Sequence, residues 1–181
     1  MRKRRLIARA SVGALAGLAA GLVTGVGARV AMRMVADGVP DGILLRPVGF
    51  TLAGSAVIVL TLGVMGASAG ILYDAIAARI PGPPRARGLL FGVLLLVVLG
   101  PLFFLGNPDE FFTEGRVRLF ALLFLLYGVV LGLALAPSRR IANALPHAAQ
   151  TAVVVAGLVG AGLMAFELVT VALQSTGLGS M

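Results

Sequence analysis

Five long apolar runs, almost free of charged residues, constrain this chain more than any other feature. By residue number the expected spans are 10–28, 49–73, 88–106, 118–137 and 149–173. Each is close to or above the roughly 18–20 residues that a helix needs to cross a bilayer. The runs lack the strict alternation of a half-buried strand, which argues against a β-barrel. The sequence therefore predicts an all-α, polytopic membrane helical bundle of about five transmembrane helices.

The composition favours one integral membrane domain over residues 1–181. Hydrophobic residues make up 59% of the chain and charged residues 12%, with a mean hydropathy of +1.04. A soluble domain carries about 25% charged residues, so this chain has too little polar surface to stay in water. Arginine outnumbers lysine fourteen to one, which fits a GC-rich bacterial genome. We expect a multi-pass protein of the bacterial inner (plasma) membrane.

The distribution of basic residues predicts that the N-terminus is cytoplasmic and the C-terminus is outside. With that orientation, ten basic residues lie on the inner side and five on the outer side, as the positive-inside tendency requires. The inner residues are Arg2, Lys3, Arg4, Arg5, Arg9, Arg79, Arg85, Arg87, Arg139 and Arg140, and the outer ones are Arg29, Arg33, Arg46, Arg116 and Arg118. A cleaved signal peptide over 1–28 is the alternative, although its apolar stretch is longer than usual.

The net charge of +8 does not point to nucleic acid. A basic patch that neutralises phosphates is clustered on a polar surface, whereas these basic residues flank apolar runs. They are interpreted as topology signals and lipid-headgroup contacts. The expected partners are the lipid bilayer and a second copy or another membrane subunit, with no nucleic acid.

Glycines recur every four residues in the first run, at Gly13, Gly17, Gly21 and Gly25. The same spacing continues to Arg9 on one side and to Arg29 and Arg33 on the other. Small residues let membrane helices approach closely, so this ridge predicts helix packing. Two interpretations remain: a surface for self-association or a partner subunit, and packing within the chain's own bundle.

A weak internal repeat accompanies these ridges. The motifs Gly66-xxx-Gly70 and Gly128-xxx-Gly132 are each followed by arginine and proline in an inner connection. Spans one and two could therefore be a parallel duplicate of spans three and four, and no inverted repeat is visible.

Glu167 is the one ionisable residue well inside an apolar run. Intramembrane acids often mark ion or proton paths, but Glu167 could also reach water or pair structurally with an arginine. Arg29 and Arg33 emerge at the same predicted end, where they could bind a lipid phosphate or an anionic ligand. Alternatively, Arg33 pairs with Asp37 and both arginines extend to the surface. A contact between Arg29 and Glu167 is a further hypothesis.

The connections carry weaker signals. Residues 107–114 have the capping residue, proline and acids of a short surface helix, and a metal site on these acids is not expected. Residues 139–145 could form a brief amphipathic helix stopped at Pro146. Asp74 ends the second span where it can reach water, and Pro101 is expected to kink the third.

The chain has no cysteine and one histidine, and it lacks the serine-elbow, zinc-protease and phosphate-loop motifs. No catalytic residue, metal or cofactor is expected, and the balance leans against an enzyme. The favoured interpretation is a non-enzymatic structural or complex-forming membrane subunit that uses glycine-mediated packing. The alternative is a small transporter or channel component that moves a proton or ion through Glu167.

Overall fold

The chain is all-helical in the computed structural model, which describes residues 2–36, 51–106 and 114–175. The elements are α1 (Arg2–Ala36), α2 (Leu52–Ile76), the short 3₁₀ helix η1 (Ala77–Arg79), α3 (Pro84–Gly106), α4 (Glu114–Ala144) and α5 (His147–Ser175). Each of the five α-helices is long and apolar enough to cross a membrane. The expectation of an all-α chain with five candidate spans is confirmed, and these ranges contain no strand.

Three of the helices, α1, α4 and α5, extend beyond both ends of the apolar runs that predicted them. α1 begins eight residues before its expected span and ends eight residues after it, because arginine and lysine are good helix formers outside the apolar segment. α4 continues through Pro137 to Ala144. The expected separate amphipathic helix at 139–145 is therefore wrong, since most of this segment is the last part of α4 and Ala142 is buried in the core.

Local chemistry marks several helix ends. The Thr51 hydroxyl accepts a hydrogen bond from the Gly54 backbone N–H at 3.1 Å, a typical N-cap. Pro84 occupies the first position of α3, where its missing N–H costs nothing. Gln150 Nε2 donates to the carbonyls of Ala142 and Leu145 at 2.8 and 3.2 Å. These bonds join the end of α4 to the start of α5. The predicted surface helix at 107–114 falls mostly outside the described residues.

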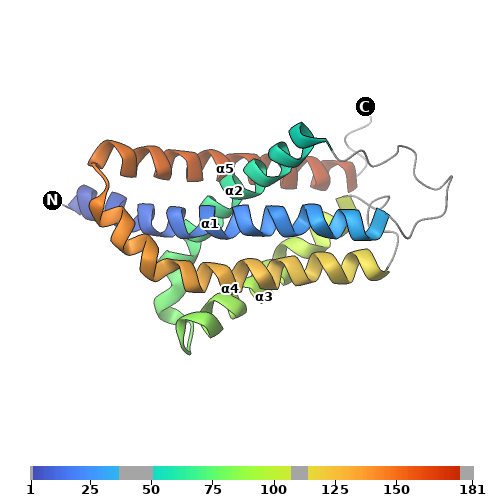
Figure 1. Cartoon of the computed structure of the whole chain (residues 1–181), viewed down its shortest axis with the longest axis horizontal. Helices are drawn as coiled ribbons and strands as arrows, with labels where there is room; N and C mark the ends of the chain where they lie inside the picture. Colours follow the sequence, from blue (N-terminus) through green and yellow to red (C-terminus); the bar gives the residue numbers. More distant parts are fainter. Residues whose placement is uncertain (1, 37–50, 107–113, 176–181) are drawn as a thin grey trace.

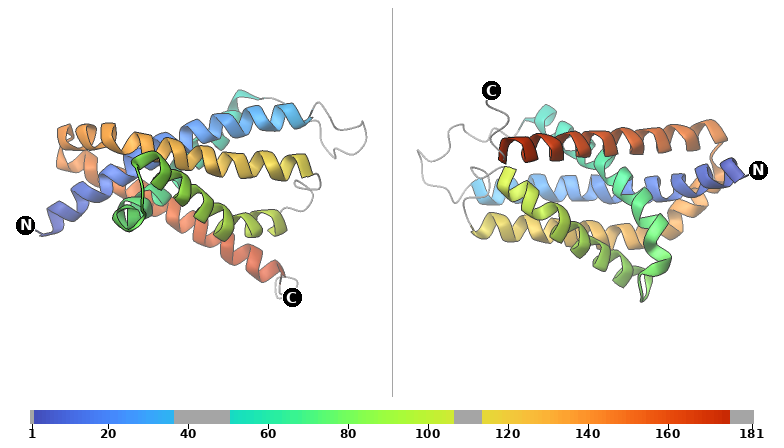
Figure 2. Two further views of the ribbon diagram at one scale, coloured as in Figure 1. Left: turned by 90° about the horizontal axis from the view of Figure 1, so that it is seen from below. Right: turned by 180° about the vertical axis from the view of Figure 1, so that it is seen from behind.

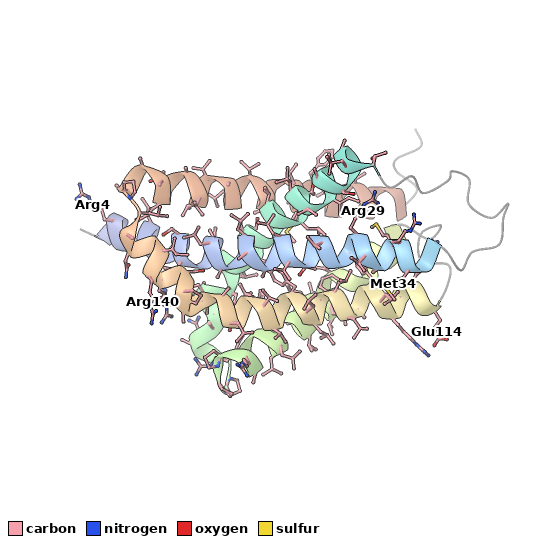
Figure 3. All side chains as sticks on the ribbon, viewed as in Figure 1. Arg4, Arg29, Met34, Glu114 and Arg140 are labelled. Carbon is pink, nitrogen blue, oxygen red and sulfur yellow. The ribbon has the colours of Figure 1, made fainter. Side chains whose placement is uncertain are left out.

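Helix α1 lies at the centre and packs against α2, α4 and α5 (Figure 1). α2 crosses α1 obliquely, α3 packs on α4, and α5 packs mainly on α2 (Figure 2). Consecutive helices run in opposite directions. One end of the bundle, here called the basic end, therefore collects the start of α1, η1, the start of α3 and the end of α4. Arg4 and Arg140 lie at this end, and Arg29 and Glu114 at the opposite end (Figure 3).

The glycine ridge of α1 lies directly against the backbone of α2. A Cβ atom added at any of its four glycines would come closer than 3.0 Å to backbone atoms of α2. The glycines are Gly13, Gly17, Gly21 and Gly25, and the atoms they would meet belong to Gly70, Gly66, Leu62, Gly63 and Val59. The ridge is thus occupied within the chain, and only glycine permits the two backbones to approach this closely.

The pair α3 and α4 repeats this contact in the same register. A Cβ on Gly17 would meet the Gly66 oxygen and the Gly70 Cα, and a Cβ on Gly88 would meet the Gly128 oxygen and the Gly132 Cα. The reciprocal contacts correspond as well. The equivalent pairs are Gly17 and Gly88, Gly21 and Gly92, Gly66 and Gly128, and Gly70 and Gly132. The register shift is 71 residues between α1 and α3 and 62 residues between α2 and α4.

Burial agrees with the two shifts at three further pairs of equivalent residues. Ala20 of α1 and its equivalent Phe91 of α3 are both fully buried. On the second helices, the buried pair Ala69 and Tyr73 corresponds to the buried pair Leu131 and Leu135. The fold is therefore two parallel copies of one helical hairpin, α1–α2 and α3–α4, followed by the single helix α5.

Candidate functional site

The basic end contains an ion pair between α1 and α2. Arg9 Nε donates to Asp74 Oδ2 at 3.0 Å, and Arg9 Nη2 donates to the Asp74 carbonyl at 3.2 Å. The Asp74 side chain is only 9% exposed, whereas that of Arg9 is 62% exposed. The expectation that Asp74 reaches water at the end of its span is therefore wrong. Its carboxylate is enclosed and depends on Arg9, because a buried charge needs a partner.

Sequence reasoning missed this pair, although a signal for it exists. The four-residue glycine spacing of α1 extends back to Arg9, and the spacing of Gly66 and Gly70 extends forward to Asp74. The two ridges face each other in antiparallel order. The residues that continue the two series, Arg9 on α1 and Asp74 on α2, must therefore also face each other. A Cβ on Gly13 would already lie 3.0 Å from Asp74 Cβ.

Two further side chains join the basic end from α2 and α3. Tyr73 is fully buried, and its ring lies 5.1 Å from the ring of Phe91 at an interplanar angle of 45°. Arg87 follows Pro84 by three residues and is half-buried. Its charge and that of Asp74 both act on the Tyr73 hydroxyl. This end therefore combines two arginines, one carboxylate and one phenol from three helices.

At the opposite end, the candidate residue Arg29 is buried. Its residue exposure is 8%, and Arg29 Nε donates to Ser55 Oγ on α2 at 2.9 Å. Ser55 Oγ in turn donates to the Thr51 carbonyl at 2.9 Å. Arg29 is thus held between α1 and the start of α2. The alternative in which Arg29 extends to the surface is not what the structure shows.

The other candidates of this end are less enclosed or lie outside the described part. Arg33 is exposed on the last turn of α1, and its predicted partner Asp37 is outside the described residues. Glu167 lies in α5, but its side chain is also outside the described part, so the hypothesis of a contact with Arg29 stays a prediction. Glu114 is exposed and pairs with Arg118 four residues later.

Polar contacts also tie the helices together midway along the bundle. The Tyr127 hydroxyl on α4 donates to the Gly66 carbonyl at 2.7 Å, at the glycine contact between α1 and α2. The Ser68 hydroxyl donates to the Gly157 carbonyl and so joins α2 to α5. Thr24 Oγ1 on α1 is buried without a hydrogen-bond partner. These groups hold helices together in an apolar interior, and no chain of ionisable side chains connects them within the described residues.

Within the described ranges, no group of three His, Asp or Glu side chains could hold a metal ion. The polar clusters therefore offer charge pairing and hydrogen bonding at the two ends of the bundle. No family model, no curated protein and no solved structure matches this chain.

Proposed function

We propose that this chain is a multi-pass integral protein of a bacterial inner membrane, with the basic end in the cytoplasm. Large apolar side chains are exposed around the bundle on all five α-helices, among them Val26, Leu60, Val97, Leu122 and Leu158. Such a surface would aggregate in water and suits lipid. The excess of arginine at the basic end supports a cytoplasmic N-terminus.

Within the membrane, the proposed role is that of a non-enzymatic, complex-forming subunit that associates through α5. The glycine ridges of α1 to α4 are occupied inside the chain, so they leave no glycine face for a partner. α5 is the least buried candidate span. It carries small exposed residues at four-residue spacing, Ala148, Ala152 and Ala156. This exposed face is the observation that carries the proposal, because small residues favour close helix association in lipid.

The test compares Ala152→Leu with Ala161→Leu. Both alanines are exposed on α5, and nine residues at 100° each place them on opposite sides of the helix. We expect Ala152→Leu to lower the association constant about fivefold or more, because overpacking a helix interface costs about 1–3 kcal/mol. The readout is cross-linking and size after purification in mild detergent. Equal assembly of the two variants, or a wild type that is monomeric and copurifies with nothing, would contradict the proposal.

The second candidate is a small transporter or channel component that moves a proton or ion through Glu167, and the burial of Arg29 favours it. At 8% exposure, Arg29 places a positive charge inside the bundle between α1 and α2. Arg29 (Figure 3) and the last turns of α5 (Figure 1) lie toward the same end of the bundle. In proteoliposomes, Glu167→Gln should abolish ion or proton flux and leave assembly unchanged. Undiminished flux in that variant would reject this candidate.

A further inference from the structure

Arg87 on α3 carries a charge that the surrounding residues leave unbalanced. Its Nε atom is buried and has no hydrogen-bond partner, and within the described residues its side chain forms no ion pair. Asp74 is the carboxylate of this cluster, and Arg9 already binds it at 3.0 Å. Within the cluster of Arg9, Asp74 and Arg87, one positive charge is therefore uncompensated.

The glycine contact of the hairpin forms without an arginine at the equivalent position of the other copy. The shift of 71 residues makes Arg87 the equivalent of Ala16, which is fully buried in the first hairpin. A methyl group occupies the equivalent position of the first hairpin. Partial burial of an unpaired cation costs free energy, so a partner from outside the chain would explain the arginine.

An apolar line on α3 begins at Arg87. Leu94 and Val98 follow it by seven and eleven residues, which places all three side chains on one side of the helix. Leu94 is 46% exposed and Val98 is 55% exposed. A half-buried cation is therefore followed along the helix by an uncovered apolar strip. A ligand with an anionic head and a hydrocarbon tail has the complementary pattern.

We propose that Arg87 binds the phosphate group of an anionic phospholipid whose acyl chain lies along Leu94 and Val98. The planar guanidinium fork suits a phosphate oxygen pair, and basic sites between membrane helices on the cytoplasmic side bind anionic headgroups. Free phosphate has the same anionic chemistry but no acyl chain that could contact Leu94 and Val98. The inference rests on the proposed membrane insertion and orientation.

The experiment measures binding of phosphatidylglycerol to the purified full chain in nanodiscs of phosphatidylcholine. The variants are Arg87→Gln, Arg87→Lys and the control Arg85→Gln, which removes an exposed arginine two residues away. A surface arginine that is attracted to anionic lipid by its charge alone raises the binding affinity about fivefold. We expect Arg87→Gln to lower the affinity more than about tenfold and Arg85→Gln to lower it by no more than about fivefold. Arg87→Lys keeps the positive charge but lacks the planar guanidinium group, so its affinity should lie between those of Arg87→Gln and Arg85→Gln.

Two further arms separate the lipid from free phosphate. Millimolar inorganic phosphate should not displace phosphatidylglycerol from the wild type, and Leu94→Ser should weaken lipid binding without unfolding the protein. Displacement by inorganic phosphate would overturn the lipid assignment. Equal losses in Arg87→Gln and Arg85→Gln would overturn the specific site in favour of a diffuse basic surface.

Failure of the proposed function gives a different result. A chain that is not a membrane protein would not be retained in the nanodiscs, whatever their headgroups. If folded protein is retained but shows no preference for phosphatidylglycerol over phosphatidylcholine, the Arg87 site is rejected and the proposed membrane insertion is not. The thermal midpoint of each variant in phosphatidylcholine provides the folding control.

Discussion

At the scale of single residues, the basic end pairs an enclosed carboxylate with an exposed guanidinium. Asp74 is 9% exposed and Arg9 is 62% exposed, so the two partners respond differently to loss of the other. Without Arg9, the carboxylate of Asp74 stays enclosed and unpaired, which is costly. Without the charge of Asp74, Arg9 remains in contact with water and loses little.

This asymmetry predicts that Arg9→Gln destabilises the protein more than Asp74→Asn. Removing the partner of an enclosed charge costs up to about 3–5 kcal/mol, and the exposure of Arg9 reduces this to about 2 kcal/mol. We expect Asp74→Asn to cost about 1 kcal/mol or less. Thermal or denaturant unfolding in detergent measures both, together with the double variant. Equal costs for the two single variants would contradict the assigned burial.

At the scale of the helices, the two hairpins use the same contact and should fail in the same way. Gly17 and Gly88 are equivalent residues whose added Cβ would overlap a carbonyl oxygen of the facing helix. The first hairpin extends the contact over four glycines of α1, whereas the second relies on Gly88 and Gly92 of α3. The two hairpins therefore share a register, but the close contact of the first extends over more residues than that of the second.

We expect Gly17→Leu and Gly88→Leu each to cost at least about 2 kcal/mol, because a larger side chain forces the backbones apart. Gly162→Leu is the control, since a Cβ there meets nothing within 4 Å. The measurement is the yield of folded, monodisperse protein in mild detergent and its thermal midpoint. If both ridge variants match Gly162→Leu, the close contacts do not stabilise the fold.

The apolar runs predicted the five helices because the length of a span is a property of one helix alone. The four-residue spacing of Gly13 to Gly25 predicted a packing face, but a face does not specify its neighbour, so the choice between α2 and a second chain remained open until the structure showed it. The role of Tyr127 was not predictable, because its acceptor is the Gly66 backbone carbonyl, which carries no sequence signal. Asp74 was misjudged because its distance from the end of the span was considered without the facing helix.

At the scale of the whole molecule, basic residues collect at one end of an alternating five-helix bundle. Arg79, Arg85, Arg139 and Arg140 of this end are exposed and come from three separate elements. An arrangement of this kind is typical of a protein that inserts with that end in the cytoplasm. The start of α1 and the end of α5 lie at opposite ends of the bundle (Figure 1).

The absence of cysteine from the sequence permits a direct test of this orientation with single thiols. Glu114 and Asn143 are both exposed and lie at opposite ends of α4. In intact bacterial cells, a membrane-impermeant maleimide should label Glu114→Cys and should label Asn143→Cys only after lysis. The reverse pattern would show that the orientation is inverted.

The duplicated hairpin also bears on the order in which the chain folds during synthesis. The closest contacts of the first hairpin all lie before residue 77, and those of the second lie between residues 84 and 132. Each set is complete as soon as its second helix has been made, and short-range contacts form early. The contact between Tyr127 and Gly66 spans 61 residues and forms only when α4 arrives. The two hairpins can therefore close one after the other, and the contact between Tyr127 and Gly66 then joins them before α5 is added.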